Sequence, residues 1–257
     1  MPGSLTIVGT GIRVGVQFTP EARAAVLRAD RVLHLGAEPL MRHWLSTLRP
    51  DATSLHSFYA PGKERTETYR EMVEAILAPV REGHDVCAAF YGHPGVFVSP
   101  SHEAVRQARA AGYDATMLPA ISAEDCLFAE LGIDPGRTGC QSYEATNFLL
   151  TNRPIDAAAV LILWQVGVLG EWGHARKTDE RRLGLLVDRL LEVYPAEHKA
   201  ILYEASPYPI GDAIAARTPL GRLAQAVVTA GTTLVVPPRD RAHSDPTVRA
   251  RLRRPPA

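Results

Sequence analysis

Phe90-Tyr91-Gly92-His93-Pro94-Gly95-Val96-Phe97 follows directly on the apolar run Val86-Cys87-Ala88-Ala89. A short apolar run that ends in turn residues is typical of a buried strand. Glycine has no Cβ atom, so a glycine-containing turn lets the backbone approach a ligand closely, and α/β sheets bind ligands at the carboxyl ends of their strands. Most Gly-Pro clusters are plain turns. The flanking Tyr91 and His93 favour a ligand-binding turn here.

Outward from this segment, apolar runs and helical patterns alternate over residues 1–120. The apolar runs predict strands at 5–8, 31–35, 85–90 and 116–118. Thr19 followed by Pro20 predicts the start of one helix, and composition predicts further helices at 65–80 and 101–110. Strands that alternate with helices form parallel sheets covered on both faces, so the predicted fold class is α/β.

A second section begins after Pro119. Ser122 and the acidic residues behind it predict a helix start, and apolar runs predict strands at 160–164, 200–203 and 233–236. Core packing best explains the helical apolar stripe Leu183, Leu186, Val187, Leu190, Leu191 and Tyr194. After Pro238 the sequence is rich in arginine and loses its apolar pattern, which predicts a mobile tail. The expected domains are therefore residues 1–119 and 120–238, followed by the tail 239–257.

The composition disfavours several classes of protein. Lys plus Arg and Asp plus Glu both number 28, and a net charge of zero gives no general attraction to nucleic acid or to an anionic membrane. No apolar run approaches the roughly 18 residues of a membrane span, and no signal peptide is visible. The three cysteines fit neither a disulfide framework nor a zinc site. We therefore expect a cytoplasmic protein without nucleic-acid or membrane partners.

Two tyrosines and an arginine stand out in residues 58–69. Arg65 and Tyr69 lie four residues apart and share one face of the predicted helix, and Tyr59 precedes the turn Pro61-Gly62. One interpretation is a structural tyrosine pair with a surface arginine. The other is a site that removes a proton from a weak acid, where Arg65 favours a phenolate by lowering its pKa. Spacing alone leaves both interpretations open.

Gly9 and Gly11 after the first predicted strand suggest a dinucleotide site, but the pattern does not fit. Gly15 has the wrong spacing for a G-x-G-x-x-G motif. The second strand ends in Leu35-Gly36 rather than in an acidic residue that would hold a ribose. A nicotinamide or flavin cofactor is therefore disfavoured.

Three segments resemble the tetrapyrrole methylase superfamily, the class III methyltransferases that use S-adenosylmethionine (SAM). They are Tyr91–Val98, Leu118–Phe128 and Leu163–Gly167. Within that superfamily the sequence most resembles the borosin peptide α-N-methyltransferases, which methylate backbone amides of a ribosomally made peptide. The resemblance covers about residues 4–238, which is nearly the whole chain.

This resemblance implies two α/β domains with the SAM cleft between them, a homodimer and no metal ion. By position, it implies catalytic roles for Tyr59, Arg65, Tyr69 and Tyr91. It implies cofactor contacts at His93, Val96, Ala123, Gln165, Ala205, Thr232 and Thr233. His93 stands where tetrapyrrole methylases usually carry an aspartate, and this departure favours peptide methylation over porphyrinoid methylation.

A second departure from the pattern of the family concerns the substrate. The fungal borosin enzymes are long fusions whose own C-terminus is the substrate, whereas residues 237–257 lack a Val/Ile-rich segment. The leading hypothesis is therefore α-N-methylation of a separate precursor peptide, the split form. One alternative is SAM-dependent methylation of a tetrapyrrole or other small molecule by the same fold, which has no need for an amide-deprotonating set of residues. The other is a protein that binds a peptide without turnover.

Overall fold

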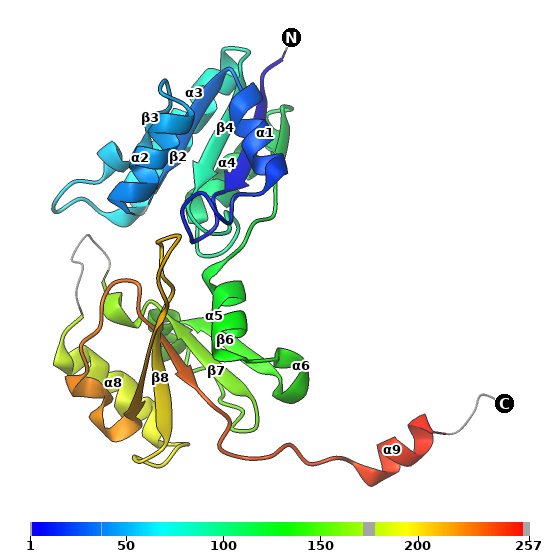
Figure 1. Cartoon of the computed structure of the whole chain (residues 1–257), viewed down its shortest axis with the longest axis vertical. Coiled ribbons are helices and arrows are strands. Elements are labelled where there is room, and N and C mark those ends of the chain that lie inside the picture. The colour runs from blue at the N-terminus through cyan, green and yellow to red at the C-terminus, as the bar shows by residue number, and fades with distance from the viewer. Residues whose placement is uncertain (1, 37, 172–177, 254–257) are drawn as a thin grey trace. The chain divides into compact units, whose positions relative to one another are not determined.

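Residues 2–36, 38–171 and 178–253 are described by the computed structural model, and the chain divides into two units (Figure 1). Unit 1 comprises Met1–Ile133, Glu171–Ala175 and Glu204–Ile214. Unit 2 comprises Asp134–Gly170, Arg176–Tyr203 and Ala215–Ala257. The chain therefore leaves unit 1, builds much of unit 2, and returns to unit 1 before it finishes in unit 2.

Unit 1 contains a five-stranded sheet in the order β3-β2-β4-β1-β5. Its strands are β1 (Ser4–Gly9), β2 (Arg31–Leu35), β3 (Thr53–Ser54), β4 (Asp85–Phe90) and β5 (Asp114–Met117). All four pairings between neighbouring strands are parallel, which confirms the predicted parallel α/β sheet. Because the strands are parallel, the loops at their carboxyl ends meet along one edge of the sheet.

Helices cover both faces of this sheet. They are α1 (Pro20–Arg28), α2 (Pro39–Leu48), α3 (Arg65–Arg81) and α4 (Ser99–Ala110), with a 3-10 helix η1 (Leu55–Phe58). Helix α5 (Ala123–Leu131) follows the last strand and also belongs to unit 1. Successive strand residues point to opposite faces, so two cores form. Ile7 packs in one core with Ile76 of α3, and Val8 packs in the other with Val26 of α1 and Leu45 of α2.

Unit 2 contains a mixed sheet in the order β6-β7-β10-β8-β9. Its strands are β6 (Cys140–Glu144), β7 (Val160–Trp164), β8 (Lys199–Glu204), β9 (Ile214–Pro219) and β10 (Thr233–Val236). Strand β6 pairs with β7 in parallel, whereas β10 runs antiparallel to both β7 and β8. The start of β10 therefore lies beside the ends of β7 and β8.

The helices of unit 2 are α6 (Pro135–Thr138), α7 (Ala145–Leu150), α8 (Glu180–Leu191) and α9 (Pro246–Leu252), with 3-10 helices η2 (Val166–Val168) and η3 (Leu220–Gln225). The predicted apolar stripe of α8 is confirmed as core at Leu183, Leu186 and Leu190, which are at most 2% exposed. The prediction is wrong for Leu191, which is 38% exposed at the end of the helix. The Arg-rich tail contains α9, which the sequence pattern did not predict and which has no buried residue.

The structural division falls after Ile133, whereas the sequence predicted a break after Pro119. Helix α5 accounts for the difference, because its side chains bond to the loop that follows β1. Gln17 Nε2 donates to Cys126 Sγ at 3.3 Å, and Arg13 Nη2 donates to Glu130 Oε1 at 2.7 Å. The capping box predicted at Ser122 is present at the start of this helix. Among the described residues, no helix is long and apolar enough to cross a membrane.

Candidate active site

The turn after β4 is bonded to the turn after β1. Gly92 N–H donates to Gly11 O at 2.8 Å, and Gly11 N–H donates to Gly92 O at 3.2 Å. Both glycines have positive φ angles, of 67° and 71°, which residues with a Cβ rarely adopt. Tyr91 N–H donates to Leu35 O at 3.2 Å, which ties the same turn to the end of β2. Backbone bonds therefore hold three strand ends together at one edge of the sheet.

Gly9 shows how closely these turns pack. A Cβ atom there would lie 2.2 Å from Gly92 O, 2.5 Å from the Ala120 Cβ and 2.7 Å from the Pro94 Cδ. Side chains cannot occupy such distances without movement of the backbone. The glycine at this position is therefore required by packing, as the sequence pattern of a close backbone approach predicted.

The loop that follows Gly92 is held by its own side chains. His93 Nδ1 accepts from Gly95 N–H at 2.9 Å, and His102 of α4 lies with its Nε2 2.9 Å from Gly95 O. Phe97 has a φ of 56°, an uncommon conformation for a non-glycine residue, and it is 48% exposed. Val96, an expected cofactor contact, is 37% exposed and so remains accessible. No sequence pattern assigned His102 a role, because its contact with this loop depends on the fold.

The structure brings together the four residues expected to be catalytic. Tyr59 follows η1, Arg65 and Tyr69 lie on the first two turns of α3, and Tyr91 follows β4. A side-chain hydrogen bond joins Tyr59 to Tyr69, and the charges of Tyr69, Tyr91 and Arg65 all act on Tyr59. Arg65 is half-buried, and its guanidinium belongs to the electrostatic surroundings of Tyr59 and Tyr91.

Arg65 lowers the pKa of Tyr59 and of Tyr91, as expected, but burial outweighs its effect in the free protein. Burial, followed by Tyr69 and Tyr91, raises the pKa of Tyr59 well above its ordinary value, and Arg65 opposes this only in part. Burial is also the largest cause that raises the pKa of Tyr91, with Tyr69 and the carboxylate of Glu38 next. Tyr91 is 43% exposed, so water offsets part of the effect there. Both groups are therefore neutral hydrogen-bond donors near neutral pH.

A lysine fixes the loop that carries Tyr59 to the helix that carries Tyr69. Lys63 Nζ donates to Phe58 O at 3.2 Å and forms an ion pair with Glu71 of α3. The Lys63 side chain is only 18% exposed, so solvent screens this pair less than an open surface pair. Sequence reasoning missed Lys63, because its partners become neighbours only when the loop folds onto α3.

In unit 2, three expected cofactor contacts lie at one end of the sheet. Gln165 directly follows β7 and has a φ of 62°, whereas Thr232 and Thr233 lie at the start of β10. The antiparallel pair Leu234 and Leu163 sets the register, so the start of β10 is level with Gln165. Backbone strain at a non-glycine residue is common at ligand-binding positions.

The turn before β10 packs directly on the residues after Gln165. A Cβ atom on Gly167 would lie 1.6 Å from Thr229 O. Thr232 Oγ1 accepts from Thr229 N–H at 2.8 Å, and Thr178 N–H donates to Gly167 O at 2.8 Å. Sequence reasoning identified Thr232 but not Gly167, Thr178 or Thr229.

The two remaining expected cofactor contacts belong to unit 1. Ala123 is the first residue of α5, where the Ser122 hydroxyl accepts from Asp125 N–H at 3.2 Å. Ala205 directly follows β8 and is half-buried. The expected cofactor contacts therefore come from both units: His93, Val96, Ala123 and Ala205 from unit 1, and Gln165, Thr232 and Thr233 from unit 2.

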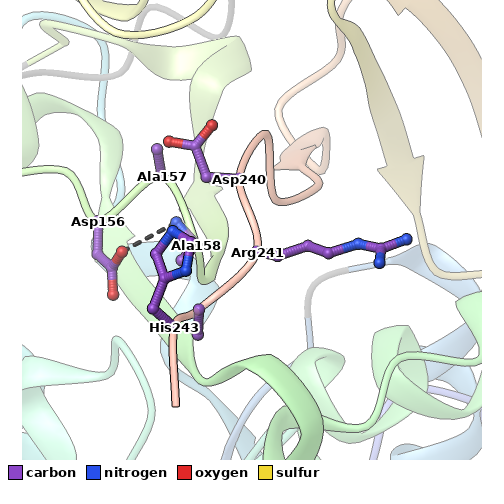
Figure 2. Close-up of a pocket in the computed structure, with 7 residues that line it drawn as sticks. Asp156, Ala157, Ala158, Asp240, Arg241 and His243 are labelled. Carbon is purple, nitrogen blue, oxygen red and sulfur yellow. Dashed lines mark hydrogen bonds between the residues drawn. The ribbon is translucent and has the colours of Figure 1, made fainter. Parts of the chain in front are cut away.

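A separate pocket lies in unit 2 and contains none of these residues (Figure 2). The turn Asp156–Ala158 and the segment Asp240–His243 line it. Asp156 Oδ1 accepts from Ala158 N–H at 2.9 Å, and Ala157 O accepts from the N–H groups of Arg239 at 2.9 Å and Asp240 at 3.0 Å. These bonds hold the start of the Arg-rich tail against the turn Asp156–Ala158. The contact between these two segments therefore accounts for the pocket.

The sequence matches the family model of the tetrapyrrole (corrin/porphyrin) methylases over residues 4–224. The methyltransferase/ribosomally synthesized cyclic peptide omphalotin A precursor of Omphalotus olearius is 40% identical over 255 residues, which cover 97% of this chain and 61% of that protein. The corresponding dendrothelin A precursor of Dendrothele bispora is 40% identical over 245 residues, covering 93% and 59%. The chain spans about three fifths of the length of these curated relatives.

Solved structures share the fold. The uroporphyrin-III-C-methyltransferase of Thermus thermophilus superposes with a TM-score of 0.66 at 21% identity, covering 93% of both chains. A conserved hypothetical protein of Aeropyrum pernix K1 superposes with a TM-score of 0.66 at 18% identity, covering 93% of this chain and 86% of the other. At these identities the likeness establishes the architecture and leaves the substrate to other observations.

Proposed function

The chain belongs to the tetrapyrrole methylase family, and we propose that it transfers methyl groups from SAM to backbone amides of a peptide. The observation that carries this proposal is the cluster of Tyr59, Arg65, Tyr69 and Tyr91. Such a set suits the removal of a proton from a weak acid. The 40% identity to methyltransferases that carry cyclic peptide precursors supports a peptide as the substrate.

The residues present fit SAM as the methyl donor. At the sheet edge of unit 1, Gly92 leaves its own surroundings open, since a Cβ there would meet only Ile12 Cδ1, at 3.3 Å. At the sheet end of unit 2, Gln165 is held in a strained conformation beside threonine hydroxyls. We propose that the expected contacts in both units bind the cofactor, which supplies an electrophilic methyl group.

The amide substrate explains the residue types of the cluster. The nitrogen lone pair of a peptide bond is delocalised into the carbonyl, so the nitrogen is a poor nucleophile. Methylation becomes feasible when a base takes the N–H proton and donors stabilise the charge that develops on the carbonyl oxygen. Alignment of the nitrogen with the methyl group lowers the barrier further, by about 7 kcal/mol in favourable cases.

We assign the roles from the contacts in unit 1. The Tyr69 oxygen accepts the amide proton, because the Tyr59 hydroxyl that is hydrogen-bonded to it can stabilise negative charge there. Tyr91 stays protonated and donates a hydrogen bond to the amide oxygen. Arg65 carries a positive charge throughout. This charge balances the negative charge that moves from the Tyr69 oxygen to the substrate amide.

The finer proposal is that the peptide is a separate molecule and binds in an extended form. An extended backbone is required because amides in helices and closed sheets already donate their N–H groups to other residues. Extended binding also lets the enzyme recognise the main chain while tolerating different side chains.

The test is a reaction of the purified chain with SAM and a synthetic Val/Ile-rich peptide, followed by intact mass measurement of both molecules. We expect methyl additions on the peptide and none on the enzyme. A peptide with proline at the methylated positions is the matched control, since proline has no N–H to replace. A mass increase on the enzyme would contradict the split form. Methyl transfer only to a uroporphyrin-type tetrapyrrole would contradict a peptide substrate and support the alternative function.

We also propose that the chain forms a homodimer. Exposed apolar side chains support an additional interface: Ile210 is 93% exposed, Ile214 61% and Tyr208 54%. Light scattering at micromolar concentration tests the proposal, and a monomer at that concentration would contradict it.

A further inference from the structure

Thr178 carries a buried hydroxyl group that lacks a hydrogen-bond partner among the described residues. The residue is 6% exposed, and its Oγ1 is fully buried. Burial of a hydroxyl without a partner is unfavourable, so such groups are rare in native proteins and require an explanation. A ligand that supplies the missing hydrogen bond is one such explanation.

The backbone of Thr178 places it at the end of the unit 2 sheet that carries the expected cofactor contacts. Its N–H donates to Gly167 O at 2.8 Å, and Gly167 follows Gln165 by two residues. Gly167 in turn packs on the turn before β10, since a Cβ atom at this glycine would lie 1.6 Å from Thr229 O. Thr178 is therefore fixed beside Gln165 and the Thr229–Thr232 turn.

The hydroxyls of Thr232 and Thr229, at the same end of the sheet, already have partners. Thr232 Oγ1 accepts from Thr229 N–H at 2.8 Å, and Thr229 Oγ1 accepts from Gly231 N–H at 3.1 Å. These bonds stabilise the turn whether or not a ligand is bound. Thr178 differs because, within the part of the chain that the structure describes, its hydroxyl neither donates nor accepts a hydrogen bond.

We infer that the Thr178 hydroxyl is a further SAM-binding group, which hydrogen-bonds a polar group of the cofactor beside Gln165. The inference rests on the proposed function, and it adds a residue that neither the sequence motifs nor the family resemblance assigned. Binding of the cofactor would satisfy Thr178 Oγ1 and so recover the free energy that its burial costs in the free protein.

The experiment compares the wild type with Thr178→Val, which keeps the shape of the side chain and removes the hydroxyl. Titration calorimetry with S-adenosylhomocysteine, the product form of the cofactor, measures affinity, and thermal melting without ligand measures stability. We expect Thr178→Val to bind about tenfold more weakly, as the loss of one hydrogen bond predicts, with a Tm equal to or above that of the wild type. Thr178→Ser, which keeps the hydroxyl, should bind within about threefold of the wild type.

Thr146→Val is the matched control. Thr146 Oγ1 accepts from Gly170 N–H at 3.1 Å, so its removal should lower the Tm and leave the affinity for S-adenosylhomocysteine unchanged. Wild-type affinity in Thr178→Val would overturn the inference, and so would a lower Tm, since it would mean that the hydroxyl already has a partner in the free protein. If Thr178→Val does not fold, Thr178→Ala provides the same comparison. Failure of the wild type to bind S-adenosylhomocysteine would instead contradict the proposed function.

Discussion

Unit 1 and unit 2 gather polar groups at a sheet end by different topologies. In unit 1 the parallel strands β1, β2 and β4 end at one edge, so the loops after them meet there. In unit 2 the antiparallel strand β10 begins where β7 and β8 end, so residues before β10 join those after β7. The comparison shows that residues far apart in the sequence reach one edge either by parallel pairing or by reversal of a strand.

The two sheet ends also differ in chemistry. Unit 1 contributes three phenols and a guanidinium, which exchange protons or stabilise charge. Unit 2 contributes an amide and threonine hydroxyls, which are neutral groups that can donate and accept hydrogen bonds. We therefore expect changes in unit 1 to alter turnover and changes in unit 2 to alter cofactor affinity.

The largest effect is expected for Tyr69→Phe. Loss of the proton-accepting oxygen should slow methyl transfer by about 100-fold or more, while the Kd for SAM stays within about twofold of the wild type. Single-turnover assays and calorimetry make the two measurements. Tyr113→Phe is the matched control, because Tyr113 packs against the same core and lies outside the cluster. Full turnover by Tyr69→Phe would contradict the expectation that changes in unit 1 alter turnover.

Glycine substitutions test the close backbone approach in each unit. Gly9→Ala and Gly167→Ala should each lower the free energy of unfolding by about 2–3 kcal/mol, because the new Cβ would meet backbone oxygen at 2.2 Å and 1.6 Å. Gly184→Ala is the control in helix α8, where a new Cβ atom would meet no described atom within 4 Å apart from the chain neighbours and the backbone of the helix itself. That change should stabilise the protein by about 0.5–1 kcal/mol. Denaturant unfolding measures the free energy of unfolding of all three variants. Equal changes in this free energy for all three would contradict the packing argument.

Two substitutions at Gln165 distinguish a role of its side-chain amide from a role of its backbone conformation. Gln165→Gly keeps the positive φ of 62° accessible and removes the amide, so it should raise the Kd for SAM by about tenfold and leave kcat unchanged at saturation. Gln165→Val should in addition destabilise the protein by about 1–2 kcal/mol, because a β-branched residue disfavours that conformation. A fall in kcat with an unchanged Kd would assign Gln165 to turnover and break the division between the units.

Lys63→Met tests whether the contact between the Tyr59 loop and α3 matters for turnover. Loss of the bonds to Phe58 and Glu71 should lower kcat by roughly tenfold, since small misplacements of reacting groups slow catalysis. The Kd for SAM should not change. Arg81→Met is the matched control, because the Arg81–Glu74 pair lies on the same helix and both side chains are largely exposed. Similar kinetics for the two variants would show that Lys63 has no positioning role.

The smallest effect concerns Tyr194, whose hydroxyl in unit 2 is buried without a partner among the described residues. Burial raises the pKa of Tyr194 from 10.0 to about 12, so its contribution to stability is present below pH 10 and is lost as the pH rises to about 12. Tyr194→Phe should gain up to about 1 kcal/mol at neutral pH and should lose less stability above pH 10. Denaturant unfolding across this pH range checks both, and a destabilised variant would contradict the assignment.

The elements that bury apolar runs were predictable, and the exposed ones were not. Strands β1, β4 and β7 appear in the sequence as apolar runs, and Thr19 and Ser122 cap helices as predicted. Strand β9 was missed because most of its residues are exposed, so burial leaves no pattern in its sequence. In the candidate site, helical spacing placed Arg65 and Tyr69 on one face of a helix, and the family resemblance implied their catalytic roles. Lys63 and Thr178 were not, because their contacts arise only from the folded chain.

The return of residues 204–214 to unit 1 has a consequence for synthesis on the ribosome. Val14 N–H donates to Pro207 O at 3.0 Å, so the loop after β1 acquires this bond only when residue 207 has been made. The nascent chain therefore carries an unfinished N-terminal half while residues 134–203 emerge and fold. Neither unit is encoded by one continuous stretch of the coding sequence. A pause in translation before residue 207 would leave unit 1 without its last segment.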